Sequence, residues 1–201
     1  MDKRWSKMEQ TSVQKLAHVL RVMVIVVFGC NIIALFLVPG LVGIWAEGGA
    51  AAFLGIDPAA EHSLLRTAVL FFAVCAQFLW RIWRCGESCV TLCLFLLSCG
   101  ACTAIVLWQG KRVLDTILTG DPFVLDNAKS MKRAAVCCFL ISGAAFVRLI
   151  WGLAYYQSVA PLLTYNALFV PIFLMAGLLC MVMSALFRQA AELKAENDLT
   201  I

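Results

Sequence analysis

Four long runs of apolar residues constrain the fold of this chain more than any other feature of its sequence. A membrane-crossing helix needs about 20 mostly apolar residues, and the runs 16–38, 90–108, 134–156 and 162–187 reach about that length. Hydrophobic residues make up 63% of the 201 residues and charged residues only 14%, whereas soluble domains average roughly 45–50% and about 25%. This excludes a soluble enzyme, a disulfide-framed secreted domain and a nucleic-acid-binding domain for most of the chain. We predict an all-α integral membrane four-helix bundle, a single membrane domain over 1–201.

A fifth apolar run, 67–80, is too short to cross a membrane easily. It holds 14 uncharged residues between Arg66 and Arg81, or about 21 Å of helix against a hydrocarbon core of about 30 Å. We expect it to form an additional interfacial helix in an outer loop over 39–88, with five spans as the alternative. We expect Pro39-Gly40 to end the first span.

The distribution of basic residues predicts the orientation, because cytoplasmic loops carry an excess of Lys and Arg. With four spans, only Arg66, Arg81 and Arg84 lie on the outer side. The basic residues at the cytoplasmic ends are then Lys3, Arg4, Lys7, Lys15, Arg21, Lys111, Arg112, Lys129, Lys132, Arg133, Arg188 and Lys194. We therefore predict that both termini, a hinge over 109–133 and a tail over 188–201 are cytoplasmic.

The hinge sequence predicts a helix, a tight corner and a second helix. Gly120 suits the position after a helix end, where the backbone turns left-handed. Asp121 can cap the next helix, and Pro122 suits its first turn. The second helix then carries Asn127, Lys129, Lys132 and Arg133. These residues either fix the topology beside anionic lipid or form a surface that faces a partner or DNA.

Two stretches of the chain resemble a known bacterial membrane family, domain of unknown function 2975. The first is Gly120-Asp121-Pro122-Phe123 followed by Asn127-Ala128-Lys129-Ser130-Met131-Lys132-Arg133, and the second is the ending Glu192–Ile201. The resemblance covers roughly the C-terminal half, and the apolar outer segment departs from the usual pattern. It implies a multi-pass protein of the bacterial cytoplasmic membrane without established catalytic residues.

The same resemblance suggests a partner. Family members are often encoded beside a small helix-turn-helix regulator, which implies a membrane sensor or anchor for a cytoplasmic DNA-binding regulator, with no direct nucleic-acid binding by this chain. The candidate cytoplasmic interaction residues are Gly120, Asp121, Pro122, Phe123, Asn127, Lys129, Lys132, Arg133, Glu192, Glu196, Asn197 and Asp198. Acidic tail residues opposite the basic hinge predict a reversible latch for which a partner competes; a solvated helix end is the alternative.

Arg148 is the one charged residue well inside a predicted span. Such residues usually face the bundle interior and often mark function. Asn31 and Asn166 lie at a similar height on other spans, and Glu87 is the nearest counter-charge. We consider a polar pocket open to the outer side, which suits an anionic or carbonyl-bearing ligand, or a structural Arg148 that snorkels or pairs with Glu87. The pocket supports an alternative function as a small transporter or an export or immunity accessory protein.

The ten cysteines lie mostly in apolar runs, where Cys acts as a small packing residue. Cys99 and Cys102 form a C-x-x-C, but a zinc site needs four ligands at one height, and we place Cys137-Cys138 nearer the inner face. No acid–base pair or activated nucleophile stands at a workable spacing. We therefore predict no catalytic residues, no metal and no cofactor. Small residues such as Ala145 and Gly177 predict close helix contacts first and a homo-oligomer face second.

Overall fold

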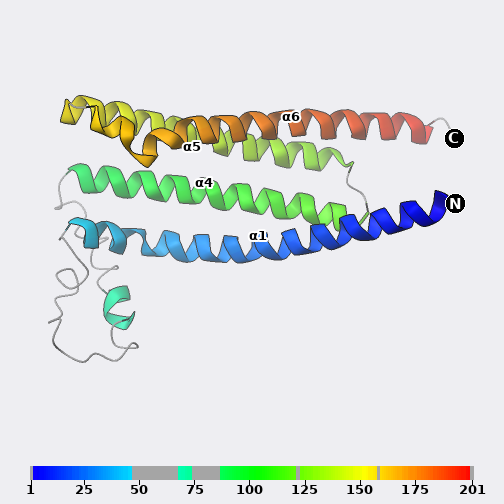
Figure 1. The fold of residues 1–201 in the computed structure, drawn as a ribbon, viewed down its shortest axis with the longest axis horizontal. Coiled ribbons are helices and arrows are strands. Elements are labelled where there is room, and N and C mark those ends of the chain that lie inside the picture. The colour runs from blue at the N-terminus through cyan, green and yellow to red at the C-terminus, as the bar shows by residue number, and fades with distance from the viewer. Residues whose placement is uncertain (1, 47–67, 74–86, 121–122, 158, 200–201) are drawn as a thin grey trace. The chain divides into compact units, whose positions relative to one another are not determined.

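The computed structural model describes residues 2–46, 68–73, 87–120, 123–157 and 159–199. Its elements in chain order are α1 (Asp2–Ala46), α4 (Glu87–Leu118), α5 (Leu125–Tyr156), the 3-10 helix η2 (Ala160–Leu163) and α6 (Tyr165–Leu199) (Figure 1). Four stretches are long and apolar enough to cross a membrane: Gln14–Ile44, Cys89–Leu118, Leu125–Tyr155 and Ala167–Asn197. Within the described residues, the predicted all-α membrane protein with four long apolar helices is confirmed.

The helices are longer than the apolar runs that predicted them. Each of the four stretches has 30 or 31 residues, which is about 46 Å of helix. Because a hydrocarbon core is about 30 Å thick, about 16 Å of each stretch extends beyond it. The predicted hinge 109–133 is accordingly almost all helix, since α4 continues to Leu118 and α5 begins at Leu125.

The prediction that Pro39 and Gly40 end the first helix is wrong. α1 continues through both residues to Ala46. Proline removes one backbone hydrogen bond, but membrane helices tolerate this where neighbouring structure holds the segment. Val38 and Val42, on either side of the proline, are 8% and 1% exposed, so packing keeps the helix continuous here.

The connection from α5 to α6 is short and begins with a left-handed residue. Gln157 has φ 46°, and its N–H donates to the carbonyl of Leu153 at 3.0 Å. η2 follows with Pro161 in its first turn. The fourth helix therefore begins at Tyr165 and not at the predicted residue 162, because the proline favours a separate turn.

The contacts divide the described chain into two units. Unit 1 comprises Met1–Asn31 and Cys102–Ile201, and unit 2 comprises Ile32–Ala101. In unit 1, α5 and α6 pack as an antiparallel hairpin. Ala145 of α5 is fully buried, and a Cβ added to Gly177 of α6 would lie only 2.7 Å from the ring of Phe139. Both small residues thus make the close helix contacts that the sequence predicted.

Unit 2 has an apolar core of its own. Val38 and Val42 of α1 pack with Cys89 and Cys93 of α4. Residues 68–73 are helical, and the ring of Phe72 lies 5.9 Å from that of Phe36. This agrees with part of the predicted extra helix; the rest of 67–80 lies outside the described residues, and the interfacial position stays a prediction.

Candidate functional site at the hinge

One end of unit 1 holds the described residues of the predicted cytoplasmic interaction set, and we call it the hinge end. Here α4 passes into α5, α1 begins and α6 ends (Figure 1). Gly120 lies at the corner with φ 89°, so the predicted left-handed turn is confirmed. Val124 is the N-cap residue of α5, without a side-chain cap. Asp121 and Pro122, which we expected to cap and begin this helix, lie outside the described residues.

Asn127 holds the corner together from inside. Its side chain is 2% exposed, and its Nδ2 donates a hydrogen bond to Oγ1 of Thr116 at 2.6 Å. Thr116 in turn donates to the carbonyl of Val113 at 2.7 Å. The first turn of α5 is thereby joined to the last turn of α4. The prediction that Asn127 belongs to an interaction surface is wrong, because helical periodicity turns it inward.

The same periodicity divides residues 126–133, which include the family-like stretch 127–133, into two faces. Ala128 and Ser130 are buried with Asn127, and Ser184 of α6 donates to the carbonyl of Ala128 at 2.7 Å. The exposed residues of the stretch are Asp126, Lys129, Lys132 and Arg133. One face therefore packs the helices, and the other remains available for contact.

An ion pair joins α1 to α4 at the hinge end. Nε of Arg21 lies 2.7 Å from Oδ1 of Asp115, and the two side chains are 38% and 37% exposed. From the sequence, Arg21 is only a topology signal and Asp115 has no predicted role. The available signal was a single acidic residue in the apolar flank of a span, which needs a cationic partner when it leaves water.

The exposed surface of the corner combines apolar and basic residues. Phe123 is 49% exposed and Leu125 is 50% exposed, with Val124 between them. Lys129, Lys132 and Arg133 follow on the outward face of α5. We call these six residues the hinge patch. Exposed apolar side chains bordered by charges are typical of interaction sites, and this one suits an acidic partner.

The predicted latch between the tail and the hinge stays a prediction. Lys129 forms its ion pair with Asp126 at 3.1 Å, inside α5. Glu192 pairs with Arg188 at 2.8 Å, inside α6. Glu196 and Asn197 are exposed on α6, and the side chain of Asp198 lies outside the described residues.

The predicted polar pocket around Arg148 also stays a prediction. Arg148 of α5 is half-buried, and Oδ1 of Asn31 in α1 is buried without a hydrogen-bond partner among the described residues. Asn166 begins α6 and Glu87 begins α4, but both side chains lie outside the described residues.

Thiols from three helices lie close together, contrary to the predicted separation of Cys137-Cys138 from Cys102. Cys102 of α4 lies beside Cys137 of α5, and Cys138 lies beside Cys180 of α6. The bounds of the apolar runs alone place Cys137-Cys138 nearer the inner face than Cys102. Counted in residues from the corner at Gly120, Cys102 lies almost as far back along α4 as Cys137 lies forward along α5. Among the described residues, no group of three or more His, Cys, Asp or Glu is arranged to hold a metal ion.

Comparison with known proteins identifies the family. The model of the family described as "Protein of unknown function (DUF2975)" matches residues 6–201. The chain belongs to this family. The match includes the first helix and residues 39–88, whereas the resemblance seen in the sequence covers roughly the C-terminal half. No curated protein and no solved structure matches the chain at a significant level.

Proposed function

We propose that this protein is a non-enzymatic membrane sensor or anchor that recruits a cytoplasmic helix-turn-helix regulator through the hinge patch. The observation that carries the proposal is the exposure of an apolar and basic surface on a corner that Asn127 braces from within. A braced corner presents a fixed surface, so a partner loses little conformational freedom of the patch on binding.

The charge of the hinge patch favours a particular face of the partner. A DNA-binding regulator needs its own basic surface for the phosphate backbone. The basic hinge patch would repel that surface and attract an acidic one. A regulator held in this way keeps its DNA-reading helix free, and the membrane protein itself has no need to touch nucleic acid.

The proposal includes a location in the bacterial cytoplasmic membrane, with the hinge and both termini in the cytoplasm. The excess of Lys and Arg in the segments that share the hinge end supports this orientation. A reporter that is active only in the cytoplasm, fused after Ile201, is expected to be active. An outer-face reporter fused at the same place is expected to stay silent; activity there would overturn the orientation.

The direct test is a two-hybrid measurement between the full chain and a helix-turn-helix regulator encoded beside its gene. Reversing two charges of the hinge patch, with Lys132→Glu and Arg133→Glu together, should weaken the interaction roughly tenfold. The matched control is Lys194→Glu, an exposed basic position of α6 outside the hinge patch, which should leave binding unchanged. Equal binding by all three chains would contradict the proposal.

The alternative is a small transporter or an export or immunity accessory protein that binds a ligand or peptide from the outer side. The buried Oδ1 of Asn31, which lacks a hydrogen-bond donor among the described residues, supports it. Cells that express the chain would then survive a membrane-active peptide, and Asn31→Leu would abolish that protection. The Lys132→Glu and Arg133→Glu variant would retain it, so the two functions are distinguishable.

A further inference from the structure

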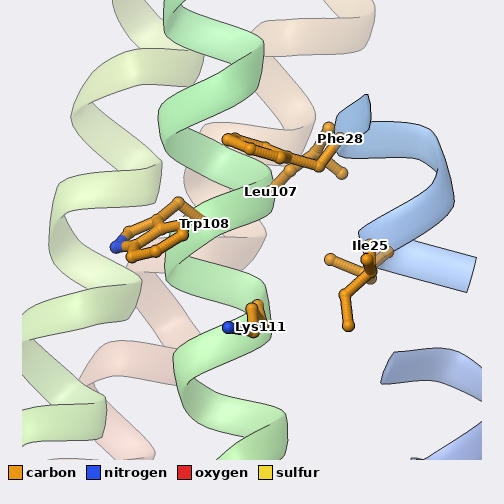
Figure 2. A pocket seen from close by; sticks show the side chains of 6 residues that line it. Ile25, Phe28, Leu107, Trp108 and Lys111 are labelled. Carbon is orange, nitrogen blue, oxygen red and sulfur yellow. The ribbon is translucent and has the colours of Figure 1, made fainter. Parts of the chain in front are cut away.

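A cavity of about 130 Å³ opens between α1 and α4 within unit 1. Figure 2 shows Phe28 and Ile25 of α1 on one side and Leu107, Trp108 and Lys111 of α4 on the other. Val24 completes the lining. The walls are therefore apolar, apart from one cationic side chain.

The charge of Lys111 is not neutralised by a carboxylate of the described residues. Its Nζ lies 5.1 Å from the centroid of the Trp108 ring, a cation–π contact. The nearest acidic residue along α4 is Asp115, one turn further on, and Arg21 already occupies its Oδ1 at 2.7 Å. The cavity thus ends at a positive charge that an anionic group would complement.

The depth of Lys111 matches the boundary of the hydrocarbon core. The apolar stretch of α4 ends at Leu118, and about 8 Å of helix extends beyond the lipid core if the excess is shared equally between its ends. The boundary then falls near residue 113, within reach of the long side chain of Lys111. Tryptophan is enriched at this level of a membrane, as Trp108 is here.

We propose that this groove binds an anionic phospholipid, with its phosphate at Lys111 and one acyl chain against Phe28 and Leu107. The apolar walls receive the chain, and the ammonium group receives the headgroup. Basic pockets between helices on the cytoplasmic side of a membrane bind anionic headgroups by the same chemistry. The bound lipid would fill a gap beside the Arg21–Asp115 ion pair and so hold α1 against α4.

Native mass spectrometry of the full chain tests the proposal with two lipids that share their acyl chains. The chain is expected to retain phosphatidylglycerol about fivefold more than phosphatidylcholine. Lys111→Gln should remove this preference. The matched control is Arg112→Gln, because Arg112 is the exposed neighbouring cation and does not line the cavity. Equal retention of the two lipids, or an unchanged preference in Lys111→Gln, would overturn the proposal.

A second measurement locates the acyl chain and does not depend on a charge change. Phosphatidylglycerol with bromine on its chains should quench the fluorescence of the native protein more than that of Trp108→Phe. With bromine-labelled phosphatidylcholine, the difference in quenching between the native protein and Trp108→Phe should be smaller. If the quenching does not depend on Trp108, or if a concentration-dependent dimer protects Trp108 from both lipids, the groove has another occupant and the inference fails.

Discussion

The hinge end of unit 1 and the core of unit 2 are packed by different chemistry. At the hinge end, Asn127 and Ser130 are buried polar residues, and Asn127 bonds to a neighbouring helix. Among the described residues of unit 2, the buried cluster consists of Val and Cys side chains, with partly buried Ile, Leu and Val packed against it. Lipid is as apolar as these side chains, so apolar contact fills space but gains little from leaving the bilayer. A hydrogen bond joins two particular atoms, and it therefore sets the register of the two helices.

This contrast explains why the hinge patch has a defined shape. The corner is held by Asn127 and Thr116, by Ser184 and the carbonyl of Ala128, and by the pair of Arg21 with Asp115. Each contact joins a different pair of helices. These polar contacts fix the positions of the helix ends that carry the hinge patch.

The largest expected effect comes from filling the closest helix contact of unit 1. Gly177→Ala should lower the free energy of unfolding by about 1–3 kcal/mol, because its Cβ would lie 2.7 Å from the Phe139 ring, which a tight core resists moving. Gly100→Ala in unit 2 should also be destabilising, since its Cβ would lie 2.8 Å from Cδ2 and 2.9 Å from Cγ of Leu35. Gly143→Ala, with open space at its Cβ, should be neutral or stabilising. Unfolding by SDS in mixed micelles measures all three.

A smaller effect is expected from the ion pair between α1 and α4. A double-mutant cycle with Arg21→Gln and Asp115→Asn should give a coupling energy of about 1 kcal/mol, since both side chains are more than a third exposed. Exchanging the two residues, Arg21→Asp with Asp115→Arg, should restore part of the loss. A coupling energy of zero would show that the pair does not hold the helices.

The clamp at the corner should give a smaller coupling energy that still has a functional consequence. The cycle of Asn127→Ala with Thr116→Val is expected to give about 0.6 kcal/mol, the average of such cycles in one well-measured membrane protein. The same variants should weaken binding of the regulator although neither residue is exposed. If stability falls while binding is unaffected, the contrast between the two regions does not extend to function.

The smallest effect is expected at the end of α6. Arg188→Ala removes an exposed ion pair with Glu192 inside one helix, and such pairs contribute little to stability. We expect an unfolding transition that cannot be distinguished from that of the native chain. A clear loss of stability would indicate that the tail contacts another part of the hinge end, as the latch requires.

Much of the hinge was predictable because its signals are local. Gly120 marks a left-handed position in any context, and its φ of 89° agrees. Asn127 was misplaced because its neighbours Lys129, Lys132 and Arg133 suggested a solvated face. The pattern of residues 127, 128, 130, 134 and 135, all buried, follows helical periodicity and would have revealed the inward face.

Composition and run length alone determined that this chain forms long membrane-crossing helices, because an apolar segment in lipid can satisfy its backbone only within itself. The tertiary structure decided which polar residues meet, since Arg21 with Asp115 and Asn127 with Thr116 depend on the register between helices. It also decided that the thiols of Cys102 and Cys137 lie close together. Register is a property of two packed surfaces, and no single run of residues contains it.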